Sequence, residues 1–204
     1  MLDATLAAQA NHVQWPARRP FVRGHRTGHG ALAVNASPTV RRFRPVIDSG
    51  AVVPTAYGAE TGTIALAETV LRRAAASTGI LHHVELRGLS LAKVSFQHDL
   101  DLIQLNGIGL RKLGLTRERV IDTGPSAYPD TAKLAQVLYD ANPGAQGIVW
   151  PSRQSDDGDA FILWGTRLDP SGASALEGPL ALDEAQGLQL VQRTCERLGV
   201  LLLA

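Results

Sequence analysis

The sequence predicts a single domain of the α+β class, because short β-type segments recur along the chain between segments with helical periodicity. The chain has 204 residues, of which 45% are hydrophobic, enough for one cored domain and few for two. No internal repeat, low-complexity tract or long linker divides it. We therefore expect strands and helices to pack around one core.

The N-terminal part of the chain contains few regular elements. Segment 1–20 includes two prolines and is expected to be a loosely attached arm in front of a domain over 21–204. Residues 21–23 predict a short strand. Residues 24–38 are rich in Gly, His, Ser and Asn and predict a long loop, the kind of segment that often carries function.

The middle of the chain predicts a strand, a helix and a hairpin. Residues 52–57 resemble a strand that tolerates Pro54 near a sheet edge. Residues 63–76 carry apolar side chains at helical spacing, so one helix is expected there. Residues 80–96 alternate well enough for two strands around Arg87-Gly88.

Helices and strands alternate in the rest of the chain. The expected elements are helices over 107–113 and 129–139, strands over 147–150 and 161–164, and a last helix after a capping-box pattern at Asp183 and Gln186. A mostly polar loop, 152–159, joins the two strands.

Positive charge is concentrated early in the chain. Residues 1–50 contain seven arginines, no lysine and two aspartates, a net charge of +5 against −4 for the rest. The planar guanidinium of arginine suits bidentate recognition of phosphate. A solvated basic face or a nucleic-acid patch would give the same count, so the cluster alone does not decide.

Cysteine and hydrophobicity patterns bear on the compartment. The single cysteine, Cys195, excludes an internal disulfide and favours a reducing compartment, so we expect a cytoplasmic protein. Residues 1–9 lack a cationic leader, and no apolar run approaches the roughly 20 residues of a membrane helix. No membrane partner is expected.

Five polar residues stand out from otherwise bland surroundings: Arg23, Arg42, Tyr57, Glu68 and Ser152. Two cations, an aromatic ring, a carboxylate and a hydroxyl are what a pocket needs to hold a pyrophosphate, stack on a flat ring and break an N-glycosidic bond. Loss of nicotinamide from a riboside develops positive charge on the ribose carbon, which a nearby carboxylate stabilises. The set indicates a dinucleotide such as NAD.

Each of these residues also has an ordinary structural interpretation. Glu68 could pair with Arg72 at i,i+4 on an exposed helix face, a pair worth a few tenths of a kcal/mol. Tyr57 could be a core aromatic, and Ser152 a turn residue after a proline. Residue physics alone favours these interpretations.

The arginine run around Arg42 leaves its own ambiguity. Arg41 and Arg44 compete with Arg42 for a phosphate-binding role. In a strand, Arg42 and Arg44 would share one face and Arg41 would point away.

Other kinds of site find little support in the sequence. His82-His83 and His98-Asp99 lack metal-ligand spacing, and adjacent histidines on a strand point to opposite faces, so no metal is expected. Gly107 and Gly109 lack the third glycine of a Rossmann fingerprint, and no P-loop occurs. Ser152 lacks a nucleophile elbow, and Cys195 is expected on the buried face of the last helix, so neither is expected to be an activated nucleophile.

Taken together, the polar residues and their neighbours resemble the RES domain family, named for its arginine, glutamate and serine. The resemblance covers most of the chain, about 21–164, and the interval from Tyr57 to Glu68 is similar to the family's. It is carried by Phe21-Val22-Arg23-Gly24-His25-Arg26, Arg42-Phe43-Arg44-Pro45, Val53-Pro54-Thr55-Ala56-Tyr57, Ala65-Leu66-Ala67-Glu68-Thr69-Val70 and Gly147-Ile148-Val149-Trp150-Pro151-Ser152-Arg153.

The resemblance implies a fold similar to mono-ADP-ribosyltransferases, with a central mixed or split sheet flanked by helices. RES proteins are toxins of bacterial toxin–antitoxin pairs that consume NAD or transfer its ADP-ribose. By this resemblance Glu68 and Arg23 are catalytic. Arg23 and Arg42 clamp phosphate and ribose, Tyr57 stacks on a ring, and Ser152 donates a hydrogen bond.

The resemblance also implies partners and an activity. We expect a helical antitoxin with a helix-turn-helix region that blocks the NAD cleft, in a homo-oligomer or a toxin–antitoxin hetero-oligomer. The expected enzyme cleaves NAD at the nicotinamide–ribose bond, as a glycohydrolase or phosphorylase. The alternatives are a mono-ADP-ribosyltransferase that modifies a protein and, in a different class, a basic nucleic-acid-binding module.

Overall fold

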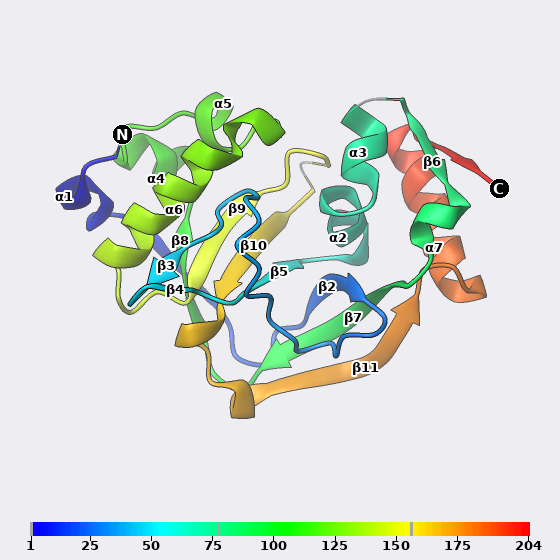
Figure 1. Cartoon of the computed structure of the whole chain (residues 1–204), viewed down its shortest axis with the longest axis horizontal. Helices are drawn as coiled ribbons and strands as arrows, with labels where there is room; N and C mark the ends of the chain where they lie inside the picture. The colour runs from blue at the N-terminus through cyan, green and yellow to red at the C-terminus, as the bar shows by residue number, and fades with distance from the viewer. Residues whose placement is uncertain (1, 77, 156) are drawn as a thin grey trace.

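A mixed sheet of eight strands forms the centre of the molecule, in the order β1-β8-β9-β10-β5-β2-β7-β11 (Figure 1). The computed structural model describes residues 2–76, 78–155 and 157–204. Neighbouring strands are antiparallel except for the parallel pair β8 and β9. The strands are β1 (His12–Trp15), β2 (Phe21–Arg26), β5 (Thr55–Ala59), β7 (Leu89–Phe96), β8 (Leu100–Gln104), β9 (Gly147–Pro151), β10 (Asp159–Trp164) and β11 (Ala173–Ala181). The predicted α+β fold with a mixed sheet and flanking helices is confirmed.

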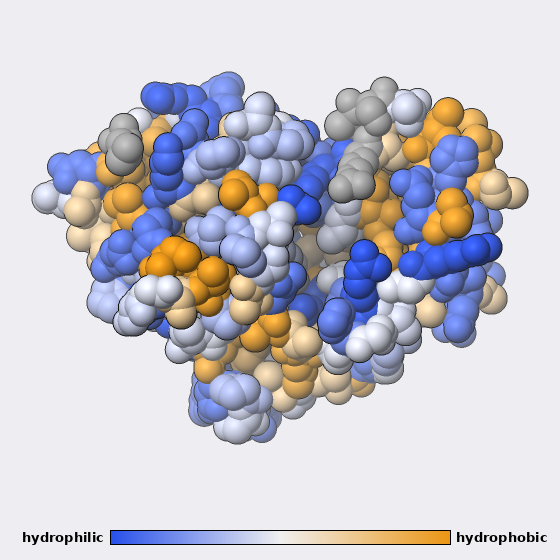
Figure 2. All heavy atoms as spheres, in the orientation of Figure 1, coloured by the Kyte–Doolittle hydropathy of each residue, from blue (hydrophilic) through white to orange (hydrophobic). Residues whose placement is uncertain are grey.

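Two groups of helices lie above the sheet in Figure 1. The first contains α1 (Ala4–Ala7), α4 (Gly107–Lys112), α5 (Arg117–Val120) and α6 (Tyr128–Ala141), and the second contains α2 (Gly62–Glu68), α3 (Leu71–Ala76) and α7 (Ala185–Leu198). Two small sheets complete the fold, formed by β3 (Ile47–Asp48) with β4 (Ala51–Val52), and by β6 (Ile80–His82) with β12 (Leu201–Leu203). Figure 2 shows the surface hollowed between the two groups of helices.

The central strands are apolar on both faces because each face covers a core. Along β10, Ala160, Ile162 and Trp164 belong to the larger core, while Phe161 and Leu163 belong to a second core on the opposite face. This alternation follows from the two-residue period of a strand. It explains why residues 161–164 form a continuous apolar run.

The helix predicted over 63–76 is wrong as a single element, since it is two helices. The backbone of Thr69 closes α2 with a bond to Leu66 O at 3.2 Å, and its hydroxyl donates to Ala65 O. Thr69 and Val70 are both β-branched, which disfavours continuing the helix. Glu68 is therefore the last residue of α2 instead of an internal one.

The hairpin predicted over 80–96 is also wrong. β6 pairs in parallel with β12, and a 3₁₀ turn over His83–Leu86 separates it from β7. β7 instead lies between β2 and β11 in the main sheet. The sequence of one segment does not reveal such pairing because the partners lie far away along the chain.

Three further expectations need correction. Residues 12–15 of the predicted arm form an edge strand that pairs with β8, and Trp15 packs against Phe161 with ring centroids 5.1 Å apart. β5 is central, between β10 and β2, instead of near an edge. The last helix starts at Ala185 after Glu184, without a side-chain cap. Asp156, in the loop 152–159, lies outside the described residues. Within the described residues, no helix is long and apolar enough to cross a membrane.

Candidate functional site

The main sheet is split between β2 and β5. These strands are registered at one pair only, Val22 with Ala59, whereas β2 pairs with β7, and β5 with β10, along their whole lengths. A cavity of about 550 Å³ lies at this split, lined by β2, β5, α2, the start of α3, the loop between β2 and β3, and one residue each of β9 and β10. The separated strands thus supply two walls of the candidate site.

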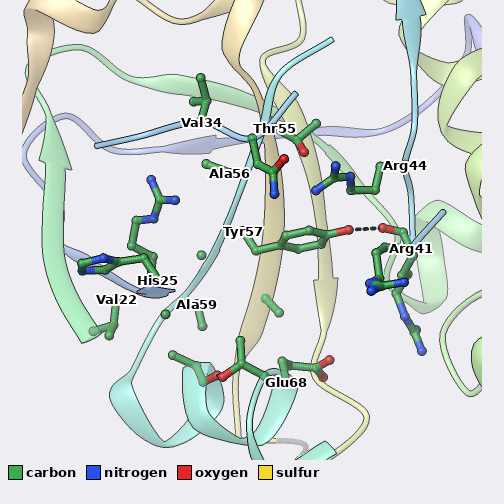
Figure 3. A pocket seen from close by; sticks show the side chains of 18 of the residues that line it. Val22, His25, Val34, Arg41, Arg44, Thr55, Ala56, Tyr57, Ala59 and Glu68 are labelled. Atoms are coloured by element: carbon green, nitrogen blue, oxygen red, sulfur yellow. Dashed lines mark hydrogen bonds between the residues drawn. The ribbon is translucent and has the colours of Figure 1, made fainter. Parts of the chain in front are cut away.

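The cavity has two distinguishable ends (Figure 3). Glu68 lies at one end, and Val34 and Thr55 lie at the other, with the ring of Tyr57 between them. Thr55 and Tyr57 are two residues apart on β5 and therefore share a face of the strand. A ligand that spans the cavity would pass the tyrosine ring.

Ser152 holds the carboxylate of Glu68. Its Oγ donates to Glu68 Oε1 at 2.8 Å, and the serine is fully buried, so it lies behind Glu68 instead of in the lining. The serine is fixed in turn, because its N–H donates to Gly158 O at 2.9 Å and its Oγ accepts from the N–H of Gln154 at 3.3 Å. One oriented hydrogen bond thus joins Glu68 to Ser152, which lies 84 positions further along the chain.

Arg23 is a buried cation in the cavity wall. It is 9% exposed, and its Nε has no hydrogen-bond partner among the described residues. Burial lowers the pKa of its guanidinium. Burying a cation without a partner is costly. The side chain is therefore suited to an anionic ligand.

Tyr57 presents its ring to the cavity and keeps its hydroxyl occupied. The hydroxyl donates to the backbone oxygen of Arg42, the bond that is dashed in Figure 3. Burial raises the pKa of Tyr57, and the charges of Arg44 and Arg72 oppose that rise without cancelling it. Tyr57 is thus a neutral ring with a fixed orientation.

Arg42 lies in a tight turn, so the alternation of side chains that a strand would impose on Arg41, Arg42 and Arg44 does not apply. The backbones of Arg41 and Arg44 bond reciprocally at 3.0 and 3.1 Å, and Phe43 between them has a positive φ of 62°. Arg42 is 2% exposed, and its guanidinium donates to the carbonyls of Ile121 and, at 2.8 Å, Thr123. Burial lowers the pKa of Arg42, and the charge of Glu68 partly restores it.

The charge balance of the lining is strongly positive. Among the described residues of the lining, Glu68 is the one acid, whereas the cations are Arg23, Arg26, Arg41, Arg42, Arg44 and Arg72. Five of the seven buried polar atoms without a hydrogen bond in the described part of the chain also belong to the lining. They are Arg23 Nε, His25 Nε2, Arg42 Nε, Thr55 Oγ1 and Trp150 Nε1. Such atoms are rare in native proteins and indicate missing partners, so the cavity fits a polyanionic ligand with further polar groups.

Four of the five residues nominated from the sequence line this cavity, and the fifth contacts one of them. Sequence reasoning missed His25, Thr55 and Trp150, which come into the lining through strand register. It considered Arg72 only as a surface partner of Glu68. Within residues 2–76, 78–155 and 157–204, no cluster of His, Cys, Asp or Glu could hold a metal ion.

Comparison with known proteins agrees with the resemblance seen in the sequence. A family model described as RES domain matches residues 6–183. The fold is similar to a chain in the crystal structure of the M. tuberculosis MbcT–MbcA toxin–antitoxin complex, with a TM-score of 0.66 and 18% sequence identity. The alignment covers 92% of this chain and 95% of that chain. No curated protein sequence matches the chain.

Proposed function

The chain belongs to the RES domain family, and from this premise we propose that it cleaves NAD at the nicotinamide–ribose bond as the toxin of a toxin–antitoxin pair. The observation that carries this proposal is a cavity whose described lining includes one carboxylate, held by a hydrogen bond from Ser152, and six arginines. NAD offers the matching chemistry of a diphosphate, two flat rings and a cationic leaving group.

The carboxylate of Glu68 would act on the ribose. As nicotinamide leaves, positive charge develops on the ribose carbon, and a fixed carboxylate stabilises it without reorganising. The bond from Ser152 occupies Oε1, and no other described residue bonds Oε2, which leaves that oxygen available for a ribose hydroxyl. Water or phosphate then bonds to the ribose carbon, giving ADP-ribose with loss of a proton, or ADP-ribose phosphate.

The other nominated residues would bind and orient NAD. Arg23 would face the diphosphate from β2, as a buried cation whose Nε has no partner among the described residues. Tyr57 offers its neutral ring for stacking on a base, which offset aromatic pairs favour. Ser152 acts through Glu68 and is a positioning residue. By the resemblance, Arg42 is a further residue that binds the phosphate and ribose of NAD.

Two other functions remain as outcomes of the test. A mono-ADP-ribosyltransferase would use the same cavity and pass ADP-ribose to a protein. A nucleic-acid-binding module would need exposed cations along a surface, whereas Arg23, Arg42 and Arg44 are buried at the cavity. The burial of these three arginines favours a small ligand.

The test is incubation of the purified protein with NAD labelled in its adenosine part, with and without cell lysate. Free nicotinamide and soluble labelled product support NAD cleavage. Label that becomes attached to protein supports the transferase instead. No release of nicotinamide under either condition would reject both enzyme activities.

An antitoxin partner is part of the proposal. The structure with the similar fold is described as a toxin–antitoxin complex. A helical partner with a helix-turn-helix region would inhibit this chain by covering the cavity. The protein encoded by an adjacent gene should inhibit nicotinamide release. Release should return when that protein is removed, and measuring both tests the role.

A further inference from the structure

The six arginines of the cavity lining differ in how far their guanidinium groups are engaged by the protein. Arg42 donates to backbone carbonyls, Arg44 donates to Ser37 O, and Arg41 donates to Val40 O at 3.0 Å. The remaining three are Arg23, Arg26 and Arg72, for which the described residues show no side-chain hydrogen bond. Of these, Arg26 is exposed, whereas Arg23 is buried and Arg72 half-buried.

The guanidinium of Arg42 is anchored to the backbone of the fold. Both terminal nitrogens of its guanidinium bond to carbonyls of the segment after α5, at Ile121 and Thr123, and one also lies 3.4 Å from Val120 O. Nε is also buried and has no partner among the described residues. A guanidinium has five N–H donors, so Arg42 keeps free donors, but its orientation is set by the carbonyls that it binds.

Arg72 has the opposite character. It lines the cavity at the start of α3, one turn after Glu68, and the break at Thr69 separates the two residues onto different helices. No ion pair joins it to Glu68 or to any other acid in the described ranges. Its guanidinium carbon lies 5.4 Å from the centroid of the Tyr128 ring, a contact that orients the group without using its N–H donors.

The charge of Arg72 also affects two of the nominated residues, Tyr57 and Arg42. Burial is the main cause of the shifted pKa values of Tyr57 and Arg42, and the charge of Arg72 lowers both. Its guanidinium is therefore close enough to these groups to influence them electrostatically. A cation in this place would equally attract an anion bound beside Tyr57.

We infer that Arg72 and Arg23 together bind the diphosphate of the substrate, and that Arg42 is a positioning residue that ties the segment after α5 to the cavity wall. The inference rests on the proposed function and names its substrate-binding cations. It replaces the surface role that the sequence suggested for Arg72. Two cations from β2 and α3 match the two charges of a diphosphate.

Calorimetric titration with ADP tests the inference, because ADP carries the diphosphate but lacks nicotinamide. Arg72→Ala should weaken ADP binding about 10- to 100-fold, the effect of losing a hydrogen bond to a charged group. Arg111→Ala removes the same charge from an exposed site on α4 and should bind ADP as the wild type does. Arg42→Lys should lower Tm, since lysine cannot reproduce the paired carbonyl bonds, and should lose less ADP affinity than Arg72→Ala.

Three results would overturn the inference. They are wild-type ADP affinity in a folded Arg72→Ala protein, an Arg42→Lys protein that keeps its Tm but loses ADP binding, and a wild-type protein that does not bind ADP. The proposed function fails separately, if ADP binds as expected but NAD is not cleaved. Where NAD is cleaved, Arg72→Ala should raise KM and leave kcat nearly unchanged.

Discussion

At the scale of residues, the site depends on how one carboxylate is held. Glu68 ends a helix, where the negative end of the helix dipole does not favour an acid. The hydroxyl of Ser152 compensates by donating to Oε1 at 2.8 Å, and two backbone contacts fix the serine. A carboxylate that is already oriented loses little freedom when the ribose cation forms.

Replacement of Ser152 should therefore reduce the rate of NAD cleavage more than its binding. We expect Ser152→Ala to lower kcat about 10- to 100-fold, the effect of one hydrogen bond to a charged group, with KM nearly unchanged. Ser174→Ala on β11, outside the cavity lining, is the matched control and should behave as the wild type. A Ser152→Ala enzyme that keeps its kcat would show that the serine does not position Glu68.

The sequence nominated the polar residues because carboxylates, cations and rings have a recognisable chemistry. It could not show which arginines are free, since this depends on backbone carbonyls about 80 residues away. The bonds from Arg42 to Ile121 and Thr123 are an example. Nor could the sequence exclude a surface ion pair of Glu68 with Arg72. That pair assumes one continuous helix, and the apolar spacing of the segment does not reveal the break at Thr69.

At the scale of elements, segments with a strong apolar pattern were the most predictable. The helix α6 and the strands β9 and β10 lie close to their expected ranges because each has a strong apolar pattern and clear ends. The sequence did not predict β11, because this strand is mostly exposed and lacks an apolar pattern. Pairing was not predictable, since β6 finds its partner at the other end of the chain.

Helix α7 supports the element that carries Glu68, because it packs against α2. A Cβ on Gly187, near the start of α7, would lie 1.9 Å from Ala181 O, so the helix would have to move. Gly187→Ala should destabilise the protein by roughly 1–3 kcal/mol and lower Tm. Gly144→Ala, where no atom lies within 4 Å of the added methyl, is the control for thermal unfolding. Equal Tm values for both variants would contradict this packing.

Ionisation of Asp159, at the start of β10, lowers the stability of the fold in a pH-dependent way. Burial raises the pKa of Asp159, the charge of Glu60 adds to the rise, and Arg19 opposes it. Because the folded-state pKa lies above the unfolded one, ionised Asp159 destabilises the fold, and this cost is fully present above the folded pKa. Asp159→Asn should raise Tm at pH 7, and the gain should vanish below about pH 4, where the carboxyl is protonated in both states. A Tm gain of Asp159→Asn that grows as the pH falls would contradict a raised pKa of Asp159.

At the scale of the whole molecule, two groups of helices and a split sheet enclose one basic cavity. The proposed toxin should arrest bacterial growth and deplete NAD when expressed without its antitoxin. Expression of the Glu68→Gln protein at the same level should do neither, because the amide keeps the shape of the side chain and lacks its charge. Normal growth with an unchanged NAD pool, at high yield of soluble wild-type protein, would contradict the proposal.

The most direct test of the central claim is release of nicotinamide from NAD by the purified protein, measured beside two variants. Glu68→Gln should reduce release at least about 100-fold, the effect of losing electrostatic stabilisation at the reacting centre. Glu118→Gln, which changes an exposed acid on α5, should release nicotinamide as the wild type does. If a folded Glu68→Gln protein released nicotinamide at the wild-type rate, the account would be contradicted, because Glu68 is the one acid that the described part of the chain places in the cavity lining.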